Sequence, residues 1–247
     1  MSLIKKLKFK LFQMMNKNKQ PFECPVCHYV GPFKDISPRT GLRRNALCPA
    51  CRAHERQRIQ VLVLEKVFAE NDFSNKSMLH IAPEEVFREM CSKQFGDYQT
   101  ADLYMPDVDH KVDISEMPFE DASFDFVMAS HILGYIKDDD KAIAEIRRIL
   151  KPGGIAIVPN TIIGEKTVEY PEPNKWEAGG HIRAPGEDYF KRFDKHFSKT
   201  VEFKSADFPE KYQVYVYEDR TKWPDTMPLR PTRSGERHTD IVPVSYV

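Results

Sequence analysis

Long apolar runs are missing from this 247-residue chain. No uninterrupted apolar stretch approaches the roughly 20 residues that a bilayer crossing requires. A secretory signal is not expected either, because the N-terminus is too rich in lysine to hold an apolar signal core. Internal repeats are also lacking. We therefore expect a globular protein of the cytoplasm, with one main domain and one small appendage.

Net charge is absent overall but not locally. The whole chain has 37 basic and 37 acidic residues, whereas residues 1–58 carry 13 Lys/Arg and 3 Asp/Glu, a net charge of +10. The remainder therefore carries −10. A basic front end attracts an anionic partner such as RNA, a phosphorylated substrate or a membrane surface. The alternative is attraction between the two parts of the chain.

Residues 1–20 have the pattern of a basic amphipathic helix. Lysines separate apolar side chains that recur at helical spacing: Leu3, Ile4, Leu7, Leu11, Met14 and Met15. Such a helix lies in a membrane interface or packs on a protein surface. Two alternatives remain open at this stage: peripheral association with the inner membrane surface, or packing on the protein's own body or a neighbouring subunit.

Four of the five cysteines form two Cys-x-x-Cys pairs, Cys24/Cys27 and Cys48/Cys51, which enclose 20 residues. In a reducing compartment such pairs bind metal rather than form disulfides. Two tight turns aim four thiolates at one ion, which predicts a zinc-ribbon module at 21–52. Four thiolates leave no open position, so the Zn²⁺ is expected to be structural. The module is expected to present a set of arginines to a partner: Arg39, Arg43, Arg44, Arg52, Arg56 and Arg58.

Residues 53–218 alternate between helix and strand patterns, which is typical of a doubly wound α/β domain with a Rossmann-like seven-stranded sheet. A helix is expected at 53–71, 84–95, 138–150 and 187–197. Strands are expected at 77–82, 98–103, 112–113, 124–130, 155–159, 200–205 and 212–218. Residues 160–184 are expected to cover the active site. Residues 219–247 are expected to form an extended or disordered tail.

Polar side chains close three of the predicted strands. In a doubly wound sheet, ligands bind outside the carboxyl ends of the strands. Asp102, followed by Leu103, is placed to accept hydrogen bonds from two ribose hydroxyls. Asp113 is placed to accept an adenine amino hydrogen, while Ile114 beside it offers a backbone N–H. Ser130 and His131 close the fourth strand and face the reacting centre.

Two runs of sequence resemble a known family. Residues 113–127 (DISEMPFEDASFDFV) resemble the central signature of class I S-adenosylmethionine-dependent methyltransferases, and residues 144–154 (AEIRRILKPGG) resemble the helix before their fifth strand. The cysteine ribbon combined with the turn at 79–84 (LHIAPE) is similar to the bacterial "type 11" group. The resemblance covers roughly residues 77–160. It implies S-adenosyl-L-methionine as cofactor.

The first turn departs from that family's pattern, because residues 81–85 contain no glycine. A glycine-rich turn lets the backbone approach the methionine part of the cofactor. Here Ala82 is small and Pro83 can begin a helix. Glu84 is placed to meet the cofactor's ammonium group, or it complements the helix dipole together with Glu85.

Candidate acceptor-site residues come from the fourth strand and the cover. His181 is the first candidate for a general base, and His131 for a second catalytic group. Arg183 is a candidate for holding an anionic substrate group. Tyr135 and Trp176 are candidates for substrate contact. For the histidines, a structural role in packing is the alternative.

Three functions remain open from the sequence. The first is O-methylation of a small molecule, sugar or glycan. The second is methylation of RNA or protein, with the basic zinc ribbon holding the macromolecule. Against the second, residues 129–132 (ASHI) lack the Asn/Asp-Pro-Pro-aromatic tetrad of many amino-nitrogen methyltransferases. The third is an inactive zinc-ribbon adaptor.

Overall fold

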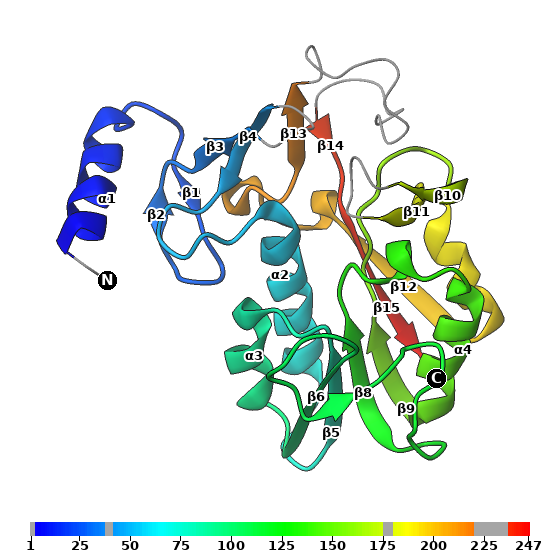
Figure 1. Ribbon diagram of the computed structural model, residues 1–247. Helices are drawn as coiled ribbons and strands as arrows, with labels where there is room; N and C mark the ends of the chain where they lie inside the picture. Colours follow the sequence, from blue (N-terminus) through cyan, green and yellow to red (C-terminus); the bar gives the residue numbers. More distant parts are fainter. Residues whose placement is uncertain (1–2, 38–41, 175–179, 220–236) are drawn as a thin grey trace. The chain divides into compact units, whose positions relative to one another are not determined.

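The computed structural model describes residues 3–37, 42–174, 180–219 and 237–247 (Figure 1). The chain divides into two compact units, each assembled from segments that are far apart in the sequence. The first unit holds the described residues within Met1–Leu62, Lys204–Asp225 and Ser234–Asp240, and the second holds those within Val63–Phe203 and Ile241–Val247. None of the described helices has the length and apolar content needed to cross a bilayer.

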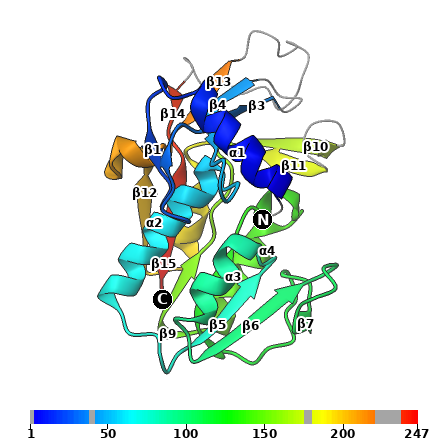
Figure 2. The ribbon, with the colours of Figure 1, turned by 90° about the vertical axis from the view of Figure 1, so that its left-hand side faces the viewer.

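A seven-stranded sheet in the order β12-β15-β9-β8-β5-β6-β7 forms the second unit. Its strands are β5 (Ser77–Ile81), β6 (Asp97–Asp102), β7 (His110–Lys111), β8 (Phe124–Ala129), β9 (Leu150–Ile157), β12 (Lys199–Lys204) and β15 (Ile241–Tyr246). The pairings between β7, β6, β5, β8 and β9 are parallel, and β15 is antiparallel to β9. Figure 2 shows β5, β6 and β7 at one end of this sheet. The predicted doubly wound seven-stranded fold is confirmed.

Alternation along the strands divides the core between the two faces of the sheet. Leu79 and Val127 belong to the same buried cluster as Ile143 and Ile146 of α4 (Asp139–Ile149). The intervening Phe126 turns to the opposite face, where it meets the rings of a phenylalanine cluster: Phe68, Phe73 and Phe95. In Figure 1, α3 (Glu85–Ser92) and α4 accordingly lie on opposite sides of the sheet. Side chains that alternate by two thus give each face its own helix layer.

Local chemistry explains where α4 begins. The Asp138 side chain accepts a hydrogen bond from the backbone N–H of Lys141 at 3.0 Å, which caps the first turn. Acidic residues follow in the first turn and Arg147 and Arg148 lie in the last, so the charges complement the helix dipole. Arg148 also donates to the backbone carbonyl oxygens of Met117 and Phe119. These contacts hold the loop before β8 against the helix.

The C-terminal part of the chain differs from the sequence prediction. The predicted helix at 187–197 is a 3₁₀ helix, η2 (Tyr189–Lys195). The predicted strand at 212–218 is β13 (Val216–Asp219), which pairs outside the central sheet. The central strand that completes the sheet is instead β15, from the segment expected to be a tail. Its Pro243 interrupts the strand pattern in the sequence, which explains why the strand was missed.

The first unit contains α1 (Leu3–Met15), α2 (Glu55–Glu70) up to Leu62, and two small sheets. One sheet pairs β1 (Phe22–Glu23) with β2 (Val30–Gly31). The other has the order β14-β13-β4-β3 and combines β3 (Lys34–Ile36) and β4 (Leu42–Leu47) with β13 and β14 (Arg237–His238). Residues near both ends of the sequence therefore build this unit together.

Candidate functional site

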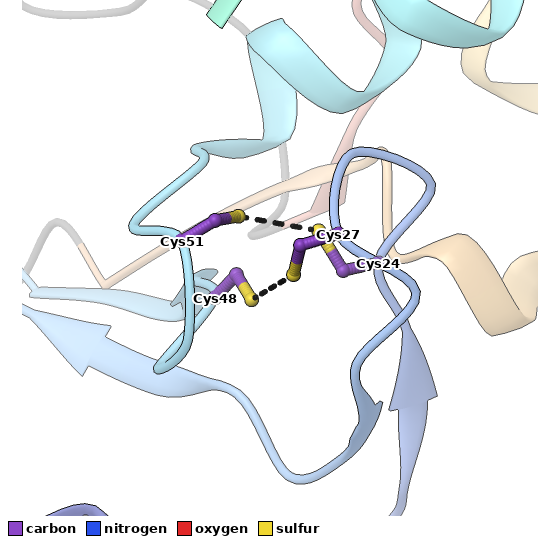
Figure 3. A group of neighbouring side chains, drawn as sticks. All are labelled: Cys24, Cys27, Cys48 and Cys51. Carbon is purple, nitrogen blue, oxygen red and sulfur yellow. Dashed lines mark hydrogen bonds between the residues drawn. The ribbon is translucent and has the colours of Figure 1, made fainter. Parts of the chain in front are cut away.

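Four cysteine side chains converge in the first unit. The sulfur atoms of Cys24, Cys27, Cys48 and Cys51 all lie within 4.8 Å of one another. The Sγ atoms of Cys24 and Cys51 are 3.6 Å apart, and those of Cys27 and Cys48 are 3.7 Å apart (Figure 3). Each pair in contact joins one thiol from each Cys-x-x-Cys turn. The two turns therefore face each other, as a shared four-coordinate ion requires.

The two cysteine turns have the same backbone hydrogen bonds. The Cys24 N–H donates to the Tyr29 carbonyl, and the His28 N–H donates to the Cys24 carbonyl. In the second turn, Cys48 N–H donates to Ala53, and Arg52 N–H donates to Cys48. His28 and Arg52 both adopt left-handed backbone angles, with φ of 57° and 69°. Two sequences with only cysteine and proline in common thus fold into the same knuckle.

Proximity of the thiols separates their pKa values. Hydrogen bonds from Cys24 and Cys51 lower the pKa of Cys48, whereas contact with Cys24 and Cys48 raises the pKa of Cys51. A negative charge on one of these sulfur atoms therefore disfavours a second negative charge on its neighbour. A divalent cation removes that repulsion and lets several thiolates coexist.

Arg58 does not face a partner as the sequence analysis expected. Its side chain is fully buried, and burial lowers its pKa. The guanidinium lies over the Phe33 ring at 4.5 Å and donates to several backbone carbonyls, those of Ala46 (2.9 Å), Ala53 (2.8 Å), Tyr212 (3.1 Å) and Gln213 (2.6 Å). Arg58 therefore ties the cysteine turns to residues 212–213 of the distant C-terminal segment.

Arg43 is also used within the unit. Its guanidinium pairs with the buried Glu55 carboxylate at 2.6 Å. Arg39 lies outside the described residues. The excess positive charge near the cysteines is thus partly consumed by internal contacts, and the charge count of the sequence overstates what a partner would meet.

In the second unit, the carboxyl ends of the parallel strands carry the predicted acidic residues. Asp102 ends β6, and its Oδ1 accepts the backbone N–H groups of Tyr104 (2.6 Å) and Met105 (2.7 Å). Among the described residues nothing donates to Oδ2. Asp113 is exposed and accepts the Ser115 N–H at 2.8 Å. Both carboxylates keep an oxygen for a ligand while their orientation is fixed. Leu103 is 45% exposed beside Asp102, and Ile114 is buried.

The glycine-free turn after β5 still adopts a glycine-like geometry. Ala82 has φ of 50°, in the left-handed region, and its N–H donates to the Ala101 carbonyl at 2.8 Å. A methyl group is the smallest side chain that can occupy this conformation at a non-glycine position. Pro83 is buried, and Glu84 accepts a hydrogen bond from the Ser130 hydroxyl at 3.1 Å. The turn and the end of β8 are therefore joined.

Aromatic rings stack beyond the ends of β8 and β9. The rings of His181 in β11 (His181–Ala184) and Tyr135 in η1 (Leu133–Tyr135) are stacked, with centroids 4.0 Å apart. Gly134 permits this approach, since a Cβ there would lie 3.0 Å from Nε2 of His181. That Cβ would also be 3.6 Å from Oδ1 of Asn160. Gly134, Asn160 and His181 therefore meet at one point.

Asn160 and Thr161 are site residues that the sequence analysis missed. Asn160 follows β9 and is 2% exposed; its Oδ1 accepts the Thr161 N–H at 3.1 Å, which fixes the orientation of the amide. Its Nδ2 is buried and has no hydrogen-bond partner among the described residues. The Thr161 hydroxyl lies 3.1 Å from Nδ1 of His131, which has φ of 58°. The signal for both was their position directly after a predicted central strand.

Arg183 differs from its predicted role in substrate binding. It is 2% exposed and donates to the backbone carbonyls of Leu133, Ile136 (2.7 Å) and Lys137 (3.1 Å). Its guanidinium also lies 3.5 Å from the Asp139 carboxylate. Arg183 thus holds η1, and with it Tyr135, against β11. Trp176 lies outside the described residues.

The family model described as "Methyltransferase domain" matches residues 66–158. Over these residues the chain is similar to methyltransferases. The match runs from Lys66, in the last turns of α2, to Val158 after β9, and includes the strand ends that carry Ala82, Asp102, Asp113 and Ser130. The match agrees with the methyltransferase prediction over residues 66–158.

Known proteins with similar sequences match parts of the chain. A sterol 4-C-methyltransferase from Caenorhabditis elegans is 48% identical over 63 residues, 26% of this chain and 18% of that protein. A demethylmenaquinone methyltransferase from Renibacterium salmoninarum is 31% identical over 121 residues, 49% of this chain and 44% of that protein. The chain thus spans less than half the length of these relatives. A geranyl diphosphate C-methyltransferase structure from Streptomyces coelicolor is 12% identical, with a TM-score of 0.49 and coverage of 79% of each chain.

The residues at the strand ends fit S-adenosyl-L-methionine, the cofactor expected from the sequence. Two oriented carboxylates with an accessible oxygen, on Asp102 and Asp113, suit ribose hydroxyls and an adenine amino group. The left-handed turn at Ala82 brings backbone close to the strand ends, and Glu84 supplies a negative charge for an ammonium group. The fit depends on the positions of these groups and not on glycine itself.

Proposed function

We propose that this protein transfers a methyl group from S-adenosyl-L-methionine to a small-molecule acceptor that must lose a proton, most simply a hydroxyl of a sugar or other small molecule. The observation that carries the proposal is the buried Nδ2 of Asn160 beside the stacked His181 ring, for which the described part of the chain supplies no hydrogen-bond partner. A buried donor with no partner costs free energy that an oxygen of a bound ligand would recover. Names of the sequence relatives, which include sterol and quinone methyltransferases, support a small acceptor.

The cofactor supplies a methyl group activated on a sulfonium, and the chain's residues orient the reaction. Asp102, Asp113 and Glu84 hold the cofactor through its ribose, adenine and ammonium groups. Asn160 Nδ2 donates to the acceptor oxygen. The His181 imidazole takes the acceptor proton, while Tyr135 stacks on the ring and fixes its plane. His131, held by Thr161, lines the transfer site.

We further propose that Cys24, Cys27, Cys48 and Cys51 bind one structural Zn²⁺. Two matching knuckles with sulfurs already within contact distance need little rearrangement to reach tetrahedral geometry. Four thiolates close the coordination sphere, so the ion stabilises the first unit and takes no part in methyl transfer.

The acceptor is tested by measuring S-adenosylhomocysteine release with a panel of nucleotide sugars, glycans, quinols, sterols and RNA. We expect turnover with one of the small molecules. His181→Ala should lower kcat about 100-fold or more while leaving cofactor affinity within about threefold, since a positioned base contributes on the order of 10² to 10⁴. Asn160→Ala should act mainly on the acceptor's KM and kcat.

The matched control is His196→Ala, because His196 pairs with Asp140 and has no part in the proposed transfer. Turnover with RNA alone would favour the macromolecular alternative and overturn the small-molecule proposal. Cofactor binding without turnover on any acceptor would favour an inactive adaptor.

Zinc is tested by elemental analysis of the purified chain. We expect about one Zn²⁺ per chain, lost in Cys27→Ser and Cys48→Ser but kept in Cys91→Ser, because Cys91 is buried in α3 outside the cluster. A zinc content equal in all three variants and the parent protein would contradict the assignment.

A further inference from the structure

The N-terminal helix α1 is attached to the first unit by one side only. The rings of Phe9 and Tyr29 meet edge-on, with their centroids 5.5 Å apart. The Lys34 ammonium lies 5.0 Å from the centre of the Phe12 ring. Gln13 also hydrogen-bonds to Tyr29. Positions 9, 12, 13 and 16 are all partly buried, and they follow the i, i+3, i+4, i+7 spacing of one helix face. This face is the packing side of the helix.

A second apolar face lies opposite the packing side. Its side chains are largely exposed: Leu7 (69%), Leu11 (54%), Met14 (71%) and Met15 (77%). At about 100° per residue these four side chains fall within an arc of about 100°, centred on the side of α1 away from Phe9 and Gln13. Four large apolar side chains gathered on one exposed face indicate an interaction surface, since such residues are otherwise scattered singly.

Positive charge flanks the exposed face. At the same helical rotation Lys8 lies on one edge of the arc and Lys10 on the other, and Lys17 follows in the turn after α1. The first acidic residue of the chain is Glu23, so residues 1–22 contain no carboxylate side chain to balance these charges. An apolar stripe with lysine on both edges is the arrangement of a helix that lies in a membrane interface.

We propose that α1 docks this protein on an anionic lipid bilayer, with Leu7, Leu11, Met14 and Met15 entering the acyl boundary and the flanking lysines meeting lipid phosphates. The packing side of α1 stays on the first unit. The inference does not depend on which acceptor the methyltransferase domain uses.

A bilayer fits this face better than a second copy of the chain. In a symmetric pair of α1 helices, the lysines of two copies would meet with no carboxylate in residues 1–22 to neutralise them. Like charges brought together oppose association, whereas each lysine near an anionic membrane gains about 1 kcal/mol, a factor of about five in affinity. Charge complementarity therefore selects the lipid surface.

The test is co-sedimentation of the full chain with phosphatidylcholine vesicles, with and without phosphatidylglycerol. We expect binding to the phosphatidylglycerol vesicles that weakens as salt rises. Leu7→Ser combined with Leu11→Ser should reduce binding about tenfold or more, because two leucine side chains no longer enter the membrane. Lys8→Gln combined with Lys10→Gln should reduce binding and flatten its salt dependence.

The control is Val30→Ser, which removes an apolar side chain that is 66% exposed in β2 of the same unit. This variant should bind vesicles as the parent protein does. Equal binding of all variants, or no binding to either vesicle, would overturn the proposal. So would a parent protein that is dimeric by light scattering and becomes monomeric in the Leu7/Leu11 variant without any vesicle binding, because the face would then join two copies.

Discussion

At the scale of single residues, Gly134 leaves the space that the His181 ring of the proposed acceptor site occupies. We expect Gly134→Ala to push the His181 ring away from Tyr135, because the added methyl would overlap the imidazole. Catalytic turnover should fall about 10- to 100-fold, as misplacement of a catalytic group costs that much. Calorimetry should show cofactor affinity unchanged within about threefold, since Asp102 and Asp113 are not displaced. Loss of cofactor binding instead would indicate a general folding defect.

His80 in β5 predicts a dependence of stability on pH. Burial, with a smaller contribution from Arg88, lowers the pKa of His80 from 6.5 to about 3. Below pH 6.5 the unfolded chain takes up a proton at His80 that the folded chain cannot. The free energy of unfolding therefore decreases as the pH is lowered from 6.5 to about 3, by at most about 1.4 kcal/mol per pH unit. Chemical denaturation between pH 7.5 and 4.5 measures this slope.

The variant His80→Asn isolates the effect, since asparagine can keep a hydrogen bond to the Tyr98 hydroxyl. Its slope should be smaller than that of the parent protein. Part of the slope should remain, because burial also lowers the pKa of His54. Although burial raises the pKa of Asp125, hydrogen bonds from Lys151 and Ser77 depress it below its ordinary value of 3.8. The stability that Asp125 contributes is therefore lost only below pH 3.8. Identical slopes for parent and variant would show that His80 is protonated while folded.

At the scale of secondary-structure elements, Arg183 links β11 to η1. We expect Arg183→Met to destabilise the second unit by about 3 to 5 kcal/mol, because three carbonyl oxygens lose their donor and Asp139 loses one of its charged neighbours. Activity should also fall through kcat, since Tyr135 is no longer held against His181. Thermal denaturation and steady-state kinetics measure the two effects.

A matched variant is Arg237→Met, which removes an arginine whose pair with Glu210 is exposed in the first unit. This change should cost less than about 1 kcal/mol, as exposed ion pairs do. An equally small cost for Arg183→Met would contradict the positioning role.

Elements with a strong local signal were predicted well. The continuous apolar run of β8 and the capped, amphipathic α4 lie within about two residues of their predicted bounds. Short elements were predicted less well. The expected helix at 187–197 is 3₁₀: the Tyr189 N–H donates to the Gly186 carbonyl and the Lys191 N–H to the Asp188 carbonyl, each three residues back.

At the scale of the whole molecule, the C-terminal strand β15 is an interior strand of the seven-stranded sheet. β15 lies between β9 and β12, and Val244 is fully buried opposite Ile157. We expect Val244→Asp to abolish folding of the second unit or to destabilise it by more than about 4 kcal/mol, because it places an unpaired charge in the core. Lys199→Asp on the neighbouring strand β12 should change stability by less than about 1 kcal/mol, since Lys199 is exposed. Circular dichroism melting distinguishes the two, and a stable Val244→Asp variant would place β15 outside the core.

The sequence by itself determined the elements and groups that depend on neighbours along the chain. The spacing of Cys24, Cys27, Cys48 and Cys51 predicted their convergence, and hydrophobic periodicity predicted the parallel strands and the acidic residues at their ends. These features are local because backbone geometry fixes them within a few residues.

Only the tertiary structure decided which distant segments meet. It placed β13 beside β4 and β15 beside β9. It buried Arg58 and Arg183, whose guanidinium groups bind backbone carbonyls of other segments. It also brought Asn160 close to His181. The sequence around an arginine or an asparagine does not show whether its side chain faces solvent or a buried carbonyl. Burial and hydrogen-bond partners depend on contacts across tens to hundreds of residues, and no local pattern in the chain encodes those contacts.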